Sequence, residues 1–373
     1  MGHACWGSKR FSVKTQTSWG LAFGEIDADR APRPWGIRPG RPGLLWDCQS
    51  RACWQCSAPV ILAYYVHDLS PFLLDFGNGI GLRWYGLAYV AAFFVGYRLY
   101  VRLTKRGYSD LAPAQVGDFI TGVALFGVIL GGRLGYMLLY DWENFSSDPL
   151  VFFKFWDGGM SSHGGMVGIV VFTFLYARRN HVSWLNIGDN LVVVAPVGLF
   201  FGRCANFING ELYGRVTGVA WAVQFPKELY DAPPEAVRLA ISGAAALNPR
   251  WTTVAAVVEN VRLSPALREQ LAGTLAPRHP SQIYEALLEG ALLFAILYIL
   301  RTRFRLPNGV LTGVFFVAYA ILRIIGEMFR EPDAPLTMAL SRGQFLSLFL
   351  VVIGVGFLVY AVLKPTWAPK FRE

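Results

Sequence analysis

Blocks of apolar residues long enough to cross a bilayer recur through this sequence and constrain its fold more than any other feature. Seven such blocks lie at about 80–101, 116–140, 160–177, 187–204, 282–300, 308–327 and 343–363. A helix of roughly 20 apolar residues spans the hydrocarbon core of a membrane. Outside a closed barrel, only a helix satisfies its own backbone there. The sequence therefore predicts an all-α polytopic membrane protein with about seven transmembrane helices.

The charge content agrees with this interpretation. Only 16% of the 373 residues are charged, whereas soluble proteins average about 25%. The net charge of +9 would also suit a nucleic-acid-binding protein. In a membrane protein, however, such an excess gathers in cytoplasmic loops. We therefore expect no nucleic-acid partner.

The charges of the loops predict how the helices are oriented. Basic residues follow every second block: Arg98, Arg102, Lys105 and Arg106 after the first, Arg178 and Arg179 after the third, Arg301, Arg303 and Arg305 after the fifth, and Lys364, Lys370 and Arg372 after the seventh. The loop after the second block is instead acidic. Because basic loops stay in the cytoplasm, we expect the N-terminus outside and the C-terminus inside.

The remaining segments complete the predicted domain organisation. Residues 205–281 mix polar and apolar sequence and suit a small helical head on the outer side. Residues 1–60 are rich in Arg, Pro, Gly and Ser and show no sustained periodicity. The predicted order is an atypical extension (1–60), an outer interfacial segment (61–79), helices 1–4 (80–204), the head (205–281), helices 5–7 (282–363) and a cytoplasmic tail (364–373).

The extension at 1–60 conflicts with the predicted orientation. It holds eight Lys and Arg against four acidic residues, and the charge rule opposes moving such a short tail across the membrane. No methionine lies between Met1 and Met137, so a shorter product would begin at a non-Met codon, for which Val60 is a plausible position. We expect residues 1–59 to be dispensable.

The cysteines do not indicate a metal site. Cys53 and Cys56 form a C-x-x-C beside Cys48, but no second pair and no nearby histidine follow, as a zinc site would need. Cys204 stands alone in an apolar block, which favours a structural role. We expect neither a metal nor another cofactor.

Polar residues gather at the outer ends of six of the seven blocks. Ionisable residues inside membrane segments are costly and point to function. They include five arginines (Arg83, Arg133, Arg203, Arg323 and Arg330) and three glutamates (Glu285, Glu289 and Glu327), with His163 and Tyr85 at the same depth. This excess of positive charge calls for an anion, and the guanidinium fork suits a phosphate. The alternative is a set of ion pairs that only joins helices.

Two segments carry most of these groups. Arg323, Glu327 and Arg330 are spaced i, i+4, i+7 and share one helix face. The stretch GRCANFINGELYG, residues 202–214, holds Arg203, Asn206, Asn209 and Glu211. The asparagines suit ester or glycerol oxygens. A helix C-cap at Gly210 is the alternative, but it does not account for the Arg and Glu.

The sequence leaves the roles of three further residues open. For His163, two interpretations remain: a hydrogen-bonded packing residue, or a general base for a thiol, since histidine titrates near neutrality. Gln282 and Glu285, in HPSQIYE, favour structural positioning.

These segments closely resemble those of the bacterial prolipoprotein diacylglyceryl transferases. The likeness rests on GRCANFINGELYG, and on LRWYG at 82–86, GGRLGY at 131–136, WDGGMSSHGG at 156–165, RHPSQIYE at 278–285 and RIIGEMFREPD at 323–333, all in the family's order. It covers about residues 70–363. The head around 217–277 is longer than usual, and residues 1–60 have no recognised counterpart.

The resemblance implies an inner-membrane enzyme with its active site towards the outer leaflet. Such an enzyme moves the diacylglyceryl group of phosphatidylglycerol to the lipobox cysteine of a preprolipoprotein and releases glycerol phosphate. The positions that the family associates with activity are Tyr85, His163, Arg203, Asn206, Glu211, Gly214, Tyr319, Arg323 and Glu327. Asn209 and Arg330 are added as substrate-binding residues, and Arg133, Gln282 and Glu285 as supporting ones.

Two other functions fit the sequence less well. A metal-dependent headgroup transferase would need several aspartates on facing helices, but Asp118 and Asp189 are expected to be isolated at the cytoplasmic ends. A lipid flippase or channel should carry polar groups through its full depth, whereas these stop in one leaflet.

Overall fold

The computed structural model of this chain describes residues 64–77, 81–154, 158–331 and 342–371. The predicted extension at 1–60, the proposed start near Val60 and the four cysteines before residue 57 lie outside these residues, as do the first residues of the interfacial segment.

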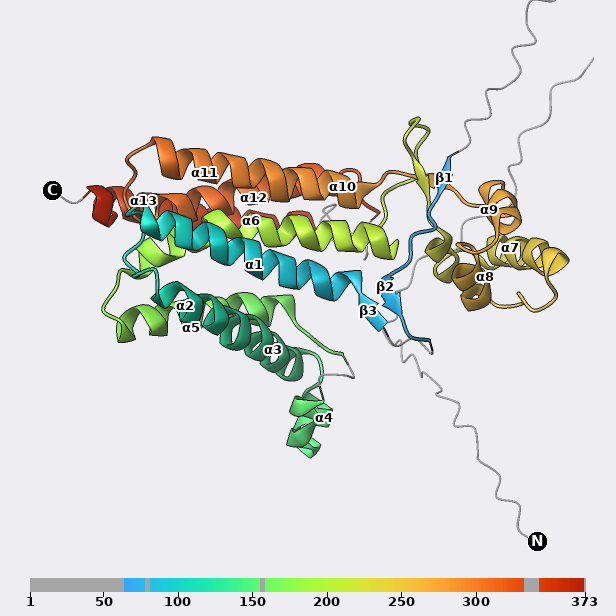
Figure 1. Ribbon diagram of the computed structural model, residues 1–373, viewed down its shortest axis with the longest axis horizontal. Helices are drawn as coiled ribbons and strands as arrows, with labels where there is room; N and C mark the ends of the chain where they lie inside the picture. The colour runs from blue at the N-terminus through green and yellow to red at the C-terminus, as the bar shows by residue number, and fades with distance from the viewer. Residues whose placement is uncertain (1–63, 78–80, 155–157, 332–341, 372–373) are drawn as a thin grey trace, which may run out of the picture. The chain divides into compact units, whose positions relative to one another are not determined.

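Long helices occupy all seven predicted blocks in this described part of the chain (Figure 1). They are α1 (Trp84–Lys105), the continuous run of α2 (Gln115–Gly122), η1 (Val123–Leu130) and α3 (Gly131–Leu139), then α5 (Ser162–Arg179), α6 (Trp184–Asn209), the continuous run of α10 (Ser281–Glu285), η5 (Ala286–Leu292) and α11 (Leu293–Arg303), then α12 (Val310–Glu327) and α13 (Arg342–Leu363). Five of the described helices are long and apolar enough to cross a membrane, namely all of these except α1 and α5. The helical polytopic fold is confirmed, and crossing by α1 and α5 stays a prediction.

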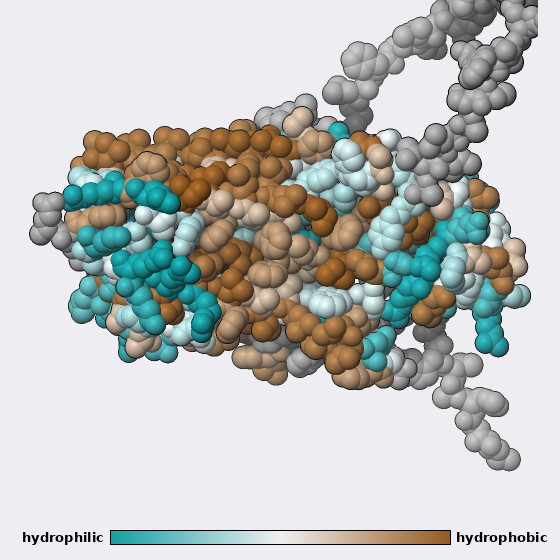
Figure 2. Space-filling view, turned by 45° about the horizontal axis from the view of Figure 1, so that its top comes forward, coloured by the Kyte–Doolittle hydropathy of each residue, from teal (hydrophilic) through white to brown (hydrophobic). Residues whose placement is uncertain are grey.

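Apolar side chains dominate the outside of these helices. Figure 2 shows brown, hydrophobic residues over the middle of the molecule and teal, hydrophilic residues gathered towards both ends. Large apolar side chains are exposed on the long helices, for example Phe94 on α1, Val167 on α5 and Val352 on α13. A surface of this kind is stable in lipid rather than in water.

Helix α6 extends beyond the predicted block at 187–204, and the alternative of a helix C-cap at Gly210 is confirmed. It continues past residue 204 to Asn209 and ends where Gly210 adopts a left-handed conformation, with φ of 63°. Glycine takes this conformation without strain, which makes it a common C-cap. Arg203, Asn206 and Asn209 therefore project from a helix rather than from a loop.

Two of the long helices contain π-helical segments, η1 and η5. Such segments are rare and frequently occur at functional sites. Segment η1 and helix α3 also pack closely against α5. A Cβ on Gly164 would lie 2.4 Å from the carbonyl oxygen of Gly131, and one on Gly168 would lie 2.3 Å from that of Gly127. The glycines at four-residue spacing thus let the two backbones touch, as expected for helices in lipid.

A smaller unit forms between α6 and α10. It contains η4 (Pro226–Tyr230), α7 (Pro234–Leu247), α8 (Val254–Asn260) and α9 (Pro265–Ala272). A small sheet joins it, in which β4 (Val223–Gln224) pairs with β5 (Pro277–Arg278) and, in parallel, with β1 (Tyr65–Val66). Buried residues including Val66, Ala244 and Leu267 give this unit its own core. The sequence did not indicate that a strand preceding α1 belongs to it.

Short elements complete the described chain: β2 (Phe72–Asp75) and β3 (Gly81–Arg83), which pair antiparallel, α4 (Trp142–Ser147), η2 (Pro149–Phe153) and η6 (Pro369–Phe371).

Asp189 has a structural role that the sequence did not indicate. It is fully buried, and its carboxylate accepts hydrogen bonds from the backbone N–H groups of Gly309 and Thr312, both at 2.8 Å. These N–H groups belong to the first turn of α12, where a helix leaves its donors without partners. Asp189 therefore joins the start of α6 to the start of α12.

Candidate active site

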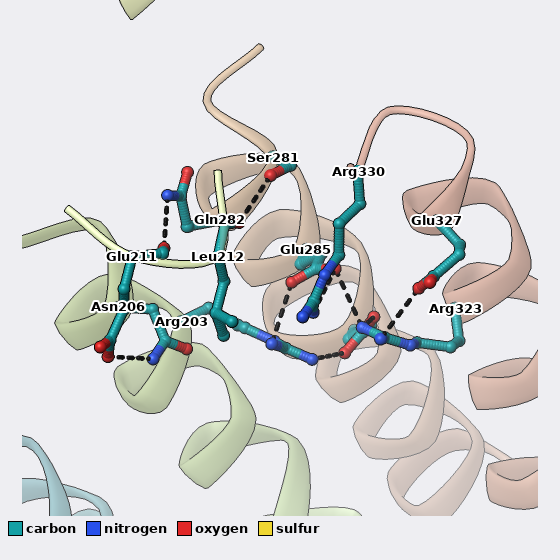
Figure 3. Close-up of polar contacts among 11 residues, drawn as sticks. Arg203, Asn206, Glu211, Leu212, Ser281, Gln282, Glu285, Arg323, Glu327 and Arg330 are labelled. Carbon is teal, nitrogen blue, oxygen red and sulfur yellow. Dashed lines mark hydrogen bonds and ion pairs between the residues drawn. The ribbon is translucent and has the colours of Figure 1, made fainter. Parts of the chain in front are cut away.

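Three long helices bring a cluster of charged side chains together. Arg203 comes from α6, Glu285 and Glu289 from the continuous α10–η5 segment, and Arg323 and Glu327 from α12 (Figure 3). Arg330 reaches the same place from the residues that follow α12. We call these six residues the Arg–Glu network.

Two carboxylates lie between two guanidinium groups. Arg203 places Nη1 3.0 Å from Oε2 of Glu285 and Nη2 3.2 Å from Oε2 of Glu289. From the other side, Nη1 of Arg323 lies 2.9 Å from Oε1 of Glu285 and 3.1 Å from Oε1 of Glu289. Each carboxylate thus bridges both arginines, which fixes the planes of the two guanidinium groups.

Glu327 and Arg330 extend this arrangement. Oε2 of Glu327 lies 2.9 Å from Nη2 of Arg323, one helical turn away on α12. Nη1 of Arg330 lies 3.5 Å from Oε1 of Glu285. The i, i+4 pair predicted from the sequence therefore forms.

Burial is unequal across the network. The side chains of Glu285 and Glu289 are 0% exposed, whereas those of Arg203 and Arg323 are 16% and 14% exposed. A buried carboxylate needs paired donors to stay charged, and the arginines supply them. The carboxylates therefore form the back of the site, and the accessible part of the network is cationic.

The expected excess of arginine in this cluster is wrong. Among the described residues, the network pairs three arginines with three glutamates. Arg83 instead lies over the ring of Phe72, 4.9 Å from its centroid. Arg133 is bound elsewhere by backbone oxygens. Counting charges at one membrane depth thus overestimated how many of them converge.

Arg133 organises the chain ahead of α5. It is 1% exposed, and its guanidinium donates to the carbonyl oxygens of Val151 (2.7 Å), Phe152 (3.0 Å), Lys154 (2.9 Å), Gly158 and Gly159 (3.0 Å). A guanidinium has five N–H donors in a rigid fork, which suits this set of carbonyls. Arg133 therefore fixes a segment that leads towards His163.

The end of α6 forms a second polar group beside the network. The Nδ2 atoms of Asn206 and Asn209 lie 3.0 and 3.4 Å from Oε1 of Glu211 and donate to it. Gln282 donates through Nε2 to the backbone oxygen of Glu211 at 2.7 Å. The buried Oδ1 of Asn209 and Oε1 of Gln282 accept no hydrogen bond from any described residue. These two acceptors are available to a hydroxyl of a bound molecule.

Gly214 fixes the loop after α6 against two other segments. A Cβ at this position would lie 2.5 Å from the backbone oxygens of both His279 and Phe329. Gly214 also forms an isolated β-bridge with Arg330. Only glycine permits this close approach, so we infer that Gly214 positions the loop next to the network. Its predicted contact with substrate stays a prediction.

Three predicted residues lie outside the Arg–Glu network. Tyr319 lies on α12, one helical turn before Arg323. Tyr85 is half-buried at the start of α1 and packs against Tyr89. His163 is exposed in the first turn of α5, and no described residue makes a hydrogen bond or ion pair with it. The structure therefore does not place His163 in contact with the arginines.

Two residues near the site were not predicted as site residues. The sequence placed Glu289 among the polar residues at the helix ends, and its four-residue spacing from Glu285 could have marked it as part of the site. His67 gave no such signal, because its partner lies 140 residues away: its Nε2 lies 2.7 Å from the carbonyl oxygen of Phe207. Burial lowers the pKa of His67 by disfavouring its charged form. His67 supports the end of α6.

This arrangement of side chains is suited to binding an oxyanion. Guanidinium groups whose orientation is already fixed donate paired hydrogen bonds to phosphate, and the neighbouring asparagine and glutamine oxygens can accept from hydroxyl groups.

Known proteins share these sequence features. A family model described as prolipoprotein diacylglyceryl transferase matches residues 71–360. A phosphatidylglycerol–prolipoprotein diacylglyceryl transferase of Coxiella burnetii is 37% identical over 316 residues, covering 84% of this chain and all of that protein. The Neisseria gonorrhoeae protein of the same name is 38% identical, covering 80% of this chain and 98% of its own length. This chain therefore belongs to the prolipoprotein diacylglyceryl transferase family.

Proposed function

We propose that this chain transfers the diacylglyceryl group of phosphatidylglycerol to the cysteine thiol of a preprolipoprotein. The family supports this reaction. The observation that carries the site assignment is the accessible edge of Arg203 and Arg323, held from behind by the buried carboxylates of Glu285 and Glu289. The lipobox is the expected peptide determinant.

The reaction is a substitution at carbon. The cysteine thiolate attacks the glycerol carbon that is bonded to the phosphodiester oxygen, a C–S bond forms and the C–O bond breaks. The electron pair leaves with glycerol phosphate, and the thiol proton passes to a base. We assign leaving-group stabilisation to Arg203 and Arg323, because donors fixed in advance at developing charge usually supply the largest catalytic effect.

The other predicted residues receive supporting roles in this proposal. Glu327 orients Arg323, and Arg330 adds positive charge beside Glu285. Asn206, Asn209, Glu211 and the backbone around Gly214 hold the glycerol part of the lipid. Tyr85 and Tyr319 line the site, and His163 takes the thiol proton after the substrates bring it within reach.

A direct assay tests this function. Purified protein in detergent is incubated with phosphatidylglycerol labelled in its acyl chains and a lipobox peptide, with a Cys→Ser peptide as the control. We expect a thioether-linked lipid on the Cys peptide only, together with released glycerol phosphate. A headgroup transferase would instead exchange the glycerol phosphate, and a flippase would move labelled lipid between vesicle leaflets without covalent transfer. Either result in place of thioether would overturn the assignment.

The proposed orientation puts the site towards the outer leaflet of the bacterial inner membrane, with the N-terminus outside, the C-terminus in the cytoplasm and residues 205–281 as a periplasmic head. Reporter fusions after Arg106, Arg179 and Arg305 should report a cytoplasmic position, and one near Asn248 a periplasmic position, because the basic loops are retained inside. A periplasmic signal at Arg179 would remove α5 as a span and contradict the seven-helix topology.

A further inference from the structure

A second cationic site lies at the other end of the helices. The Arg–Glu network is at the C-terminal end of α6, which has 26 residues and is therefore roughly 39 Å long. At its N-terminal end, Asn186 and Asn190 donate to the backbone oxygen of Tyr108. Tyr108 borders an open hollow of about 620 Å³. We call this the basal hollow.

Three basic side chains from three separate segments line the basal hollow. Arg106 follows the last residue of α1, Arg303 ends α11, and Lys370 belongs to η6 near the C-terminus. Figure 1 places the ends of α1 and α11 and the C-terminus at the same end of the molecule. The segments are far apart in sequence, so their cationic groups meet only because the chain folds this way.

Several contacts fix the position of Lys370. Its backbone N–H donates to the oxygen of Gly107 at 2.9 Å. Its Nζ donates to the hydroxyl of Tyr108 at 3.0 Å and lies 4.6 Å from the centre of that ring. Tyr108 is itself buried and donates to the backbone oxygen of Thr302 at 3.2 Å. The tail is thus tied to both α1 and α11.

The basal hollow lacks counter-charge. Within the described residues, none of Arg106, Arg303 and Lys370 forms an ion pair with a carboxylate, in contrast to the balanced Arg–Glu network. Arg106 has only a long hydrogen bond of 3.4 Å, to the hydroxyl of Tyr298. Cations that share a hollow without a carboxylate among the described residues repel one another, and a phosphate bound between them would relieve this repulsion.

One wall of the basal hollow is apolar and faces outward. Ile299 lines it and is 53% exposed, and exposed Leu292 lies two helical turns before it, at the end of η5 in the same continuous helix. A soluble phosphate would use the cations but not this wall. A phospholipid would use both, with its phosphate in the hollow and its acyl chains along α11.

We propose that the basal hollow binds the phosphate of an anionic phospholipid, at a site separate from that of the transferred lipid. In the predicted orientation this end meets the cytoplasmic leaflet, whose anionic lipids attract basic groups near the surface. Bound lipid would hold α1, α11 and the C-terminal tail together.

The test uses a lipid that is not the proposed substrate. The purified full chain in detergent is titrated with short-chain phosphatidylserine, and bound lipid is counted by native mass spectrometry. The test variant is Arg106→Gln/Arg303→Gln, which keeps the Lys370 anchor. The control is Arg178→Gln/Arg179→Gln, which removes the same charge from exposed residues at the end of α5.

We expect the test variant to bind phosphatidylserine at least about tenfold more weakly than the parent, because each basic residue near an anionic lipid adds to the affinity. The affinity of the control variant should stay within about twofold of that of the parent. Equal loss in both variants would show a general charge effect and overturn the proposal. Inorganic phosphate that displaces phosphatidylserine completely at equal concentration would assign the hollow to a soluble anion and overturn the lipid assignment. Because the readout is lipid bound rather than transferred, failure here leaves the proposed transferase function intact.

Discussion

Replacing Arg323 with alanine is expected to lower the rate of diacylglyceryl transfer by about 10²–10³-fold, the usual cost of losing one donor that is fixed in advance at developing charge. Arg323 contacts Glu285, Glu289 and Glu327 at 2.9–3.1 Å. Arg323→Lys should be nearly as damaging, because a compact ammonium group keeps the charge but cannot form paired hydrogen bonds with a phosphate. Initial rates with labelled phosphatidylglycerol and a lipobox peptide measure both effects.

A loss of stability could produce the same loss of rate. Removing Arg323 breaks its ion pair with Glu327, in which the two charged groups lie 2.9 Å apart. Breaking a buried ion pair lowers the free energy of unfolding by about 3–5 kcal/mol. The double variant Arg323→Gln/Glu327→Gln removes one charge of each sign and restores the balance of the network. We expect its thermal unfolding temperature in detergent to recover towards that of the parent while the rate stays low. If the rate recovers together with stability, Arg323 only joins helices and does not bind phosphate.

The general architecture followed from the sequence because hydrophobic blocks and glycine spacing are local signals. Helices appear at all seven blocks, and the glycine faces of η1, α3 and α5 meet as their four-residue spacing predicts. Hydropathy alone puts the end of this helix at residue 204, because polar residues begin at Arg203. A helix, however, continues until its backbone is capped. Here that cap is Gly210.

The pairing of charges could not be read in the same way. Depth in the membrane follows from position along a helix, but partners depend on how each helix is rotated about its axis. The sequence predicts similar depths for Arg133 and Arg203, yet Arg133 faces backbone carbonyls while Arg203 faces Glu285 and Glu289. The π-helical segment η5, which carries Glu289, changes that rotation, and its sequence ALLEGAL does not distinguish it from an ordinary helix.

The role of His163 depends on the substrates. Its side chain is exposed and has no polar partner among the described residues, so neither packing nor an ion pair within the protein explains its presence at the start of α5. Arg133 holds the chain just ahead of it. A general base that acts on a second substrate needs an accessible nitrogen before that substrate binds, and catalytic hydrogen bonds often form only in the complex.

His163→Gln is expected to lower the transfer rate by about 10²-fold or more near pH 6.5, the scale of general base catalysis. The difference in rate between this variant and the parent should shrink progressively as the pH rises to 9.5. A free thiol has a pKa of about 8.5, so at high pH the peptide supplies its own thiolate and needs no base. Arg203→Lys should show no such recovery, because guanidinium, ammonium and phosphodiester keep their charges through most of this range. Rates of both variants relative to the parent, measured at each pH on the same peptide, separate proton removal from leaving-group stabilisation. A His163→Gln defect that is constant from pH 6.5 to 9.5 would assign His163 to positioning and leave proton removal to water or to the phosphate itself.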